Sequence, residues 1–166
     1  MLNELAARKV PMERRAIALS EAKAKKVALE LDDPKAVVIG SDQILDLDGA
    51  ALEAPGSRDE ARERLLRLRG RRHDLVCGAA VFLGATLVES VATRVAAHVR
   101  DFSDEELDIY LQSVPEAALH TVGAYALEGL GARLIDRLEG DWFAALGLPL
   151  WPVLGILRRI ADKEVE

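Results

Sequence analysis

Hydrophobic and polar residues follow two spacings along this chain, one typical of helices and one typical of strands. Residues 11–31 mix aliphatic side chains and alanines with charges in the helical spacing, and Asp32-Asp33-Pro34 ends that pattern. A run of β-branched and aliphatic residues follows at 36–39, and Asp48-Gly49 favours a tight hairpin turn. The beginning of the chain is therefore predicted to form a helix, a buried strand and a hairpin.

Two later helices are predicted by their N-terminal residues. Ser57 stands three residues before Glu60, and Ser103 stands three residues before Glu106, which is the spacing of a capping box. The predicted ranges are 57–68, ended by Gly70, and 103–111.

Long apolar runs predict the remaining elements. Residues 73–83 and 86–99 are expected to form two strands joined by a tight turn at Gly84-Ala85. A strand-like piece at 132–138 lies in a glycine-rich region, and residues 149–160 close the chain as an apolar helix. Helices alternate with strands, and long strands also neighbour each other, so we expect an α/β protein with a mixed, twisted sheet flanked by helices.

The composition narrows the class of protein. Of the 166 residues, 50% are hydrophobic and 30% are charged, which suits a single soluble domain with an aliphatic core and argues against disorder. The formal net charge of −6 argues against nonspecific nucleic-acid binding, and no apolar run is long enough to span a membrane. The N-terminal residues lack the apolar segment of a secretory signal, so a cytoplasmic location is expected. The one cysteine, Cys77, is predicted to be a small core residue.

Asp42 is the first candidate for chemistry, because it follows the apolar strand in the sequence Gly40-Ser41-Asp42-Gln43. Ligand-binding groups of α/β proteins often stand at the ends of strands. A carboxylate at this point holds a divalent cation, activates a water molecule or caps a turn. The residues alone leave these alternatives open.

The arginines between positions 58 and 72 are a second candidate. Interleaved acidic residues favour a solvated helix face with ion pairs, although Arg71 or Arg72, after Gly70, is placed to reach a bound phosphate. The three histidines lack metal-ligand spacing. Trp142 and Trp151 are predicted to be core or interface aromatics.

Four segments, taken in order, resemble the Maf family of nucleoside triphosphate pyrophosphatases. They are VVIGSDQIL, SRDEARERLLRLRGRRHDLVCGAAV, FSDEELDIYLQS and VGAYALEGLGARLIDRLEGDWFAALGLPLWPVL. The match is strongest over residues 18–158, and the chain is identified as a single Maf-like domain over residues 1–166. The resemblance implies an elongated Maf/ITPase-like fold with a mixed sheet and a central cleft.

The resemblance also implies an activity. Enzymes of this family hydrolyse a nucleotide between its α- and β-phosphates, with a divalent cation such as Mg²⁺ or Mn²⁺, to a monophosphate and pyrophosphate. Asp42 matches the acidic residue that the family uses as a metal ligand or as the water-activating base. Lys23 matches a lysine that offsets phosphate charge, and Glu21 is a weaker neighbour of the site. A homodimer is implied, with neither a membrane nor a nucleic acid as partner.

Substrate choice is implied by two further positions, Gln43 and Glu128. Gln43 and Glu128 resemble the branch of the family that acts on 7-methyl-GTP, while UTP and dTTP are the other substrate classes considered. Glu128 stands where many members have glutamine, and its carboxylate can accept a hydrogen bond from a guanine edge. Arg71 completes the expected substrate-binding set.

Besides Glu128, the sequence departs from the family pattern in two places. The opening strand and its Ser-x-Ser-x-x-Arg phosphate-binding turn have no counterpart, so the chain resembles an N-terminally shortened member. Ala54-Pro55 stands where the family has Lys-Pro, which removes a phosphate-binding lysine. The alternatives are therefore a degenerate, non-catalytic Maf-like protein that binds nucleotide or a protein partner, for example in division control, and a structural interaction module.

Overall fold

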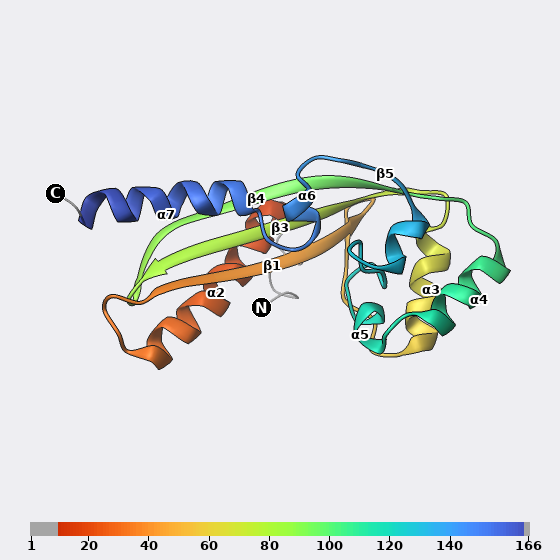
Figure 1. Cartoon of the computed structure of the whole chain (residues 1–166), viewed down its shortest axis with the longest axis horizontal. Coiled ribbons are helices and arrows are strands. Elements are labelled where there is room, and N and C mark those ends of the chain that lie inside the picture. Colours follow the sequence, from red (N-terminus) through yellow and green to blue (C-terminus); the bar gives the residue numbers. More distant parts are fainter. Residues whose placement is uncertain (1–9, 165–166) are drawn as a thin grey trace. The chain divides into compact units, whose positions relative to one another are not determined.

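The computed structural model describes residues 10–164. The prediction that the opening strand and its phosphate-binding turn are missing concerns the beginning of the chain, which lies outside the described residues. Figure 1 shows the arrangement of its helices and strands. In chain order these are α2 (Met12–Leu31), β1 (Val37–Leu47), β2 (Ala50–Leu52), α3 (Arg58–Leu68), β3 (Arg72–Leu83), β4 (Thr86–Val99), α4 (Asp104–Ser113), α5 (Glu116–Leu119), the 3₁₀ helix η1 (Leu130–Leu134), β5 (Ile135–Glu139), α6 (Trp142–Ala145) and α7 (Leu150–Glu164).

The strands form one sheet in the order β2-β1-β3-β4-β5. The β1–β2 and β4–β5 pairs are antiparallel, and β3 and β4 are joined by a turn too short for a parallel crossover. The backbone N–H of Gly84, after β3, donates to the carbonyl of Ala36, before β1, so these two strands also run in opposite directions. The α/β class with flanking helices is confirmed, with an antiparallel sheet where the alternation of helices and strands favoured a mixed one.

The chain divides into two compact units. The first unit contains residues up to Gln43, residues 76–94 and residues from Phe143 onward; the second contains residues 44–75 and 95–142. Strands β1, β3 and β4 contribute residues to both units. No helix in residues 10–164 has the length and apolar character that a bilayer crossing requires.

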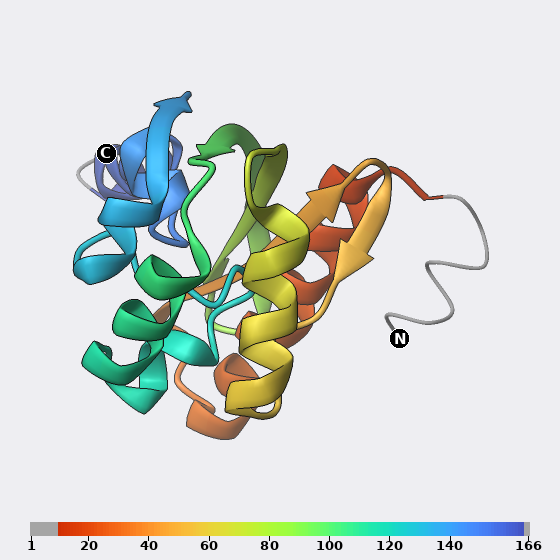
Figure 2. The same ribbon diagram turned by 90° about the vertical axis from the view of Figure 1, so that its right-hand side faces the viewer.

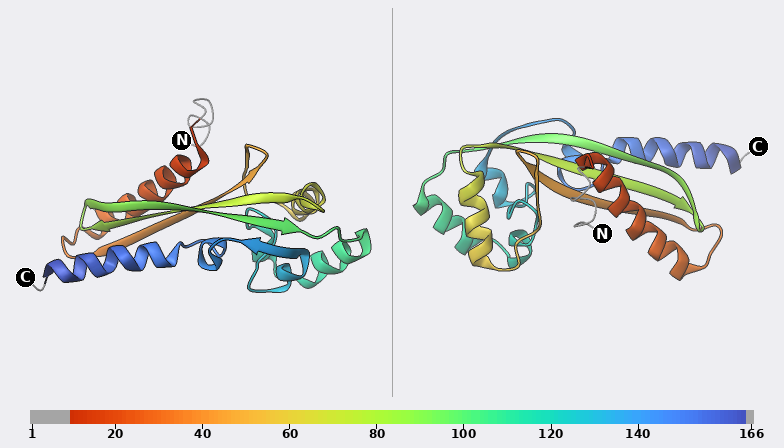
Figure 3. Two further views of the ribbon diagram at one scale, coloured as in Figure 1. Left: turned by 90° about the horizontal axis from the view of Figure 1, so that it is seen from above. Right: turned by 180° about the vertical axis from the view of Figure 1, so that it is seen from behind.

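In the first unit, helices cover both faces of the sheet, as Figure 3 shows for α2 and α7. Alternate side chains of β3 point to opposite faces, so Ala80 and Phe82 pack with α2 while Ala79 and Val81 pack with α7. All four are buried, which explains why β3 reads as a continuous apolar run. Cys77 is buried in the same strand, and its prediction as a small core residue is confirmed.

Helix α2 lies unusually close to the sheet because both surfaces carry small residues. A Cβ atom built on Gly40 of β1 would lie 2.5 Å from the carbonyl oxygen of Ser20, and one on Gly78 of β3 would lie 2.5 Å from that of Ala16. Only glycine therefore fits at either position without moving backbone. The close contact fixes the position of α2 along the sheet.

In the second unit, α3 packs against α4 and α5 (Figure 2). Leu65 and Leu68 of α3, Leu107 of α4 and Leu119 of α5 are fully buried. At the β1–β2 hairpin, both turn residues have positive φ, 54° at Asp48 and 85° at Gly49, which confirms the predicted turn.

Only one of the two predicted capping boxes forms both of its hydrogen bonds. The capping box of α4 is complete, since Ser103 and Glu106 bond each other's backbone N–H groups. At α3, Ser57 accepts from the Glu60 N–H, but the Glu60 carboxylate accepts from Gly56 rather than from Ser57. The box predicted at α3 is therefore only half formed.

Several boundaries differ from those expected. Residues 132–134 belong to η1, so the strand predicted at 132–138 begins only at Ile135. The short helices α5 and α6 were not predicted, because a single helical turn leaves no periodic pattern. Trp142 and Trp151 are 47% and 59% exposed, so they are not core residues, and the alternative that they lie at an interface stays a prediction.

The arginine-rich segment forms ion pairs, as predicted. The partners, however, come from other segments rather than from the interleaved acidic residues. The pairs are Arg58–Glu116, Arg62–Asp108, Arg69–Asp104, Arg71–Asp48 and Arg72–Asp74.

Candidate active site

Asp42 lies inside strand β1 rather than after it. The apolar run at 36–39 suggested that the strand ends before Asp42, but β1 continues to Leu47. It continues because Ile44, Leu45 and Leu47 are buried and because the strand pairs on both sides near its end. Alternation along the strand then places Asp42 on one face and its two neighbours on the other.

Ser41 and Gln43, the neighbours of Asp42, bond to the end of α6 and to the segment that follows it. The Ser41 hydroxyl lies 2.7 Å from the carbonyl oxygen of Gly78 and 2.6 Å from that of Gly147. The Gln43 side-chain amide donates to the carbonyls of Ala144 (2.9 Å) and Ala145 (3.1 Å). Gln43 was predicted to bind substrate; its amide N–H groups are used within the protein, and a role toward substrate stays a prediction.

Asp42 forms an ion pair with Lys23 of α2 on the opposite face of β1. The Lys23 Nζ lies 2.8 Å from the Asp42 Oδ1, which also accepts from the Gln43 N–H at 3.1 Å. The Asp42 side chain is 21% exposed and that of Lys23 is 59% exposed, so the pair is partly shielded yet open to a ligand. The close packing of α2 at Gly40 positions Lys23 for this contact.

The surroundings of Asp42 limit the kind of metal site that it can form. Within residues 10–164 there is no group of three or more His, Cys, Asp or Glu side chains that could hold a metal ion. A single carboxylate does suit Mg²⁺, which commonly binds through one or two carboxylates, several waters and the phosphates of a nucleotide. The residues present therefore fit a cation that arrives with a polyphosphate.

Glu21, the weaker candidate, also lies on α2. Its carboxylate accepts a hydrogen bond of 2.7 Å from the Ser90 hydroxyl of β4. It is therefore engaged in a contact between α2 and the sheet, and not paired with Lys23.

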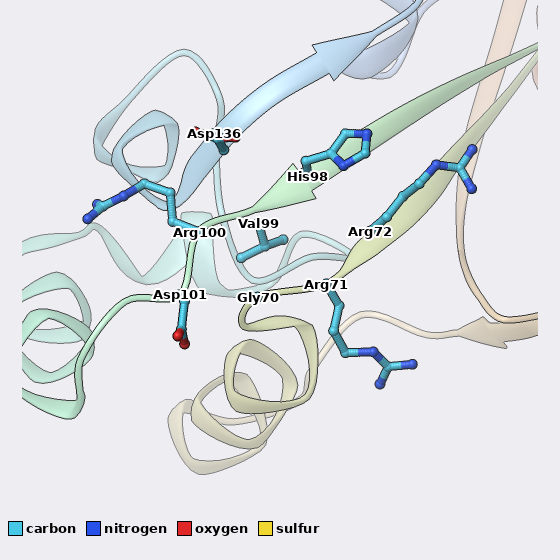
Figure 4. Close-up of a pocket in the computed structure, with 8 residues that line it drawn as sticks. All are labelled: Gly70, Arg71, Arg72, His98, Val99, Arg100, Asp101 and Asp136. Carbon is cyan, nitrogen blue, oxygen red and sulfur yellow. The ribbon is translucent and has the colours of Figure 1, made fainter.

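Arg71 and Glu128 lie in the second unit. The Arg71 guanidinium pairs with the carboxylate of Asp48 and donates to the carbonyl of Arg67. It borders an open pocket of about 420 Å³ at the start of β3 (Figure 4). In that view the side chains of Arg71, Arg72 and Arg100 extend in different directions, so the pocket does not bring their charges together.

Glu128 is exposed at the end of a loop, and its carboxylate has no hydrogen-bond partner among the described residues. The loop precedes η1 in the glycine-rich region. A free, exposed carboxylate on a short loop is available to a ligand. The substrate-binding roles of Glu128 and Arg71 stay predictions.

The segment that carries Ala54 is held by two side chains of the second unit. The Arg64 guanidinium donates to the carbonyls of Glu53 (2.7 Å) and Val122, and a ring nitrogen of His120 lies 2.9 Å from the carbonyl oxygen of Pro55. Burial, with the charge of Arg67 as a smaller cause, lowers the pKa of Arg64. Arg64 and Arg67 are the cations that border the pocket of about 280 Å³ around Ala54.

The structure thus brings together Asp42, Lys23 and Gln43 in the first unit, and carries Arg71 and Glu128 in the second. Sequence reasoning missed the role of Ser41. The signal was present, because Ser41 and Gln43 are two residues apart and so share one face of a strand.

The model of the Maf family, described as "Maf-like protein", matches residues 2–160, which extends over both units. The chain belongs to the Maf family. The resemblance identified from the four sequence segments is confirmed.

Relatives with descriptive names are similar to most of this chain. A "Nucleoside triphosphate pyrophosphatase" of Maricaulis maris is 45% identical over 143 residues, which cover 86% of this chain and 72% of the relative. A protein of the same name from Granulibacter bethesdensis is 42% identical over 144 residues, 87% of this chain and 72% of the relative. A "7-methyl-GTP pyrophosphatase" of Rhizobium meliloti is 43% identical over 145 residues, 87% of this chain and 71% of the relative.

Proposed function

We propose that this protein is a nucleoside triphosphate pyrophosphatase. The observation that carries the proposal is the Asp42–Lys23 pair, which unites a carboxylate and an ammonium group 2.8 Å apart at an accessible position. Family membership and the names of the relatives support the same activity. The reaction adds water across the α–β phosphoanhydride bond and yields a nucleoside monophosphate and pyrophosphate.

The two side chains have complementary roles in this reaction. The oxygen of a water molecule bonds to the α-phosphorus while the bond from that phosphorus to the bridging oxygen breaks, and the β-phosphate leaves with the oxygen. Asp42 orients the water and accepts its proton, or binds the cation that accompanies the phosphates. Lys23 offsets the charge that develops on the phosphate oxygens.

The finer properties of the substrate complex are part of the proposal. Asp42 would hold a Mg²⁺ or Mn²⁺ ion that arrives with the triphosphate and neutralises part of its charge. The substrate class is 7-methyl-GTP, UTP or dTTP, with Glu128, Gln43 and Arg71 as substrate-binding residues. We further propose a homodimer, and a cytoplasmic location because nucleoside triphosphates are concentrated there.

A second candidate is a non-catalytic nucleotide-binding protein of the same family. Ala54 favours it, because alanine carries no charge and the neighbouring Arg64 is occupied by two carbonyl groups. In this alternative the Asp42–Lys23 pair still meets the polyphosphate, but without turnover.

The deciding experiment measures pyrophosphate release from UTP, dTTP, CTP, GTP and 7-methyl-GTP, with Mg²⁺ or Mn²⁺. Asp42→Asn keeps the size of the side chain but removes its charge, and is expected to lower the rate at least about 100-fold. Asp162→Asn, an exposed change on α7, is the matched control and should keep the wild-type rate. Turnover that survives Asp42→Asn would contradict the assigned role, and a folded but silent wild type would favour the second candidate.

A further inference from the structure

The loop that carries Glu128, residues 121–131 and hereafter the Glu128 loop, is held by hydroxyl groups at its beginning. The Thr121 hydroxyl lies 2.9 Å from the carbonyl oxygen of Ala118 and 2.8 Å from that of Tyr125. The hydroxyl of Tyr110, on α4, donates to the carbonyl of Ala124 at 3.0 Å. These contacts close the loop on itself and tie it to α4.

The side chain of Tyr125 reaches from the loop into the interior. Its hydroxyl lies 2.6 Å from the Nε2 of His73, at the start of β3. The two residues are only 5% and 2% exposed, and their rings are 5.9 Å apart. Burial lowers the pKa of His73 to about 4 and raises that of Tyr125, so both are neutral near pH 7 and share one hydrogen bond.

Close contacts and an unusual backbone angle restrict the conformation of the Glu128 loop. Ala124 has a φ of 59°, a conformation that residues with a side chain rarely adopt. A Cβ atom on Gly123 would lie 2.4 Å from the Tyr125 ring, and one on Gly131 would lie 2.5 Å from the carbonyl oxygen of Ala126. The loop therefore depends on the tyrosine ring and on its hydroxyl partners for a single conformation.

A third attachment joins the loop to the segment around Ala54. Arg64 of α3 donates to the carbonyl of Val122 in the loop and to that of Glu53. The Glu128 loop is thus fixed to β3, α4 and α3, while Glu128 itself is exposed and free of protein partners among the described residues. Such an arrangement presents one carboxylate from a rigid support.

We infer that the buried His73–Tyr125 pair positions the Glu128 loop for selection of the nucleotide base. Neither residue is exposed to a ligand, so each acts through the loop and is a positioning residue rather than a catalytic one. The inference rests on the proposed pyrophosphatase function and extends it by naming what determines selectivity. A carboxylate discriminates between bases only when its oxygens are held where one base has a donor and another has none.

Tyr125→Phe tests the inference, because it removes the hydroxyl and keeps the ring against Gly123. Selectivity is measured as the ratio of kcat/KM between the best and the poorest of the five triphosphates. We expect Tyr125→Phe to lower this ratio about tenfold, with Glu128→Ala having a similar effect. If Tyr125 acts through Glu128, the double variant loses no more selectivity than either single variant.

Ser113→Ala is the control, because it removes a hydroxyl bond to a carbonyl in α4 without touching the loop. Its selectivity ratio should equal that of the wild type. An unchanged ratio in Tyr125→Phe, or losses that multiply in the double variant, would overturn the inference. Tyr110→Phe, which removes the Ala124 contact from the other side, is expected to act in the same direction and serves if Tyr125→Phe does not fold.

Hydrogen exchange separates this inference from the proposed function. In Tyr125→Phe the amides of residues 122–131 should exchange faster, while those of α7 keep their wild-type rates. Unchanged exchange in the loop would overturn the positioning role whatever the activity. A wild type that hydrolyses none of the five nucleotides would instead refute the proposed function, and base selection with it. The exchange result would still decide whether the His73–Tyr125 pair holds the loop.

Discussion

The two units hold their candidate site residues by different physical means. In the first unit, Lys23 meets Asp42 because glycine and alanine let α2 approach the sheet closely, so packing of small residues determines the geometry. In the second unit, the Glu128 loop is held by hydroxyl, imidazole and guanidinium groups that bond to backbone carbonyls or to each other. Packing gives a position that few substitutions can alter without unfolding, whereas polar contacts can be removed one at a time.

Gly78→Val is expected to have the largest effect, because it strikes the packing in the first unit. The added Cβ would lie 2.5 Å from the backbone of Ala16, so α2 must move, and we expect a loss of about 3 kcal/mol or more in the free energy of unfolding. Urea unfolding measures this. Gly155→Ala in α7 is the control, since its Cβ meets only the end of Arg159 at 3.7 Å and should stabilise by up to about 1 kcal/mol. Equal stability of the two variants would contradict the claim that close packing of small residues determines the geometry of the first unit.

Acid should weaken the second unit through His73. Its pKa is about 4 in the folded protein against an ordinary 6.5, because burial outweighs the opposing charge of Asp74, while His98, Arg64 and Arg72 add to the lowering. The unfolded chain then binds the proton first, so stability is complete above pH 6.5 and falls as the pH drops toward 4, by about 3 kcal/mol.

The measurement is urea unfolding at pH 7, 6 and 5, in the wild type and in His73→Gln. The pH slope should be smaller in the variant, because glutamine cannot take up the proton that the unfolded wild type binds at His73. Parallel curves for the wild type and His73→Gln would show that the pair is not a determinant of acid stability.

Lys23→Met removes the ion pair with Asp42 that the packing of α2 positions. It leaves the packing itself undisturbed, because methionine keeps most of the apolar stem. Losing one charge next to the polyphosphate is expected to lower kcat/KM about 30-fold, or about 2 kcal/mol, with little change in the free energy of unfolding. Steady-state kinetics with the best triphosphate provide the test. Lys25→Met, an exposed neighbour on α2, should leave kcat/KM unchanged. An equal loss in that variant would mean that the positive charge of α2 in general, and not Lys23 in particular, acts on the substrate.

The smallest effect is expected from the exposed ion pairs of the second unit. Arg62 and Asp108 are 2.7 Å apart, yet their side chains are 35% and 55% exposed. A double-mutant cycle with alanine should give a coupling of about 0.5 kcal/mol that declines in 0.5 M salt. A coupling several times larger would mean that surface charges, and not only carbonyl contacts, hold this unit.

Sequence patterns predicted most of the fold because its long elements have strong periodicity. The α2 helix, the β3–β4 pair and the Asp48-Gly49 turn follow directly from spacing and turn residues. The single-turn helices α5 and α6 could not be found this way, and the apolar run before Gly40 hid the continuation of β1. At the site, Asp42 was a candidate from its place after the apolar run and Lys23 was named from the family resemblance, and only the structure shows that they touch. The His73–Tyr125 contact joins residues 52 positions apart, and no local pattern reports such a pair.

The alternation of side chains along β1 has a consequence for how mutations at this site would be read in living cells. Ser41 and Gln43 bond to the end of α6 and to the segment that follows it, so changes there should lower the amount of protein that accumulates. Asp42 lies between them, and its partners are the exposed Lys23 and the adjacent Gln43 N–H, so its loss should leave the protein abundant but inactive. A library that scores abundance and turnover separately should therefore show opposite signatures at adjacent codons. Variants at 41 and 43 would lose protein abundance, whereas variants at 42 would lose turnover alone.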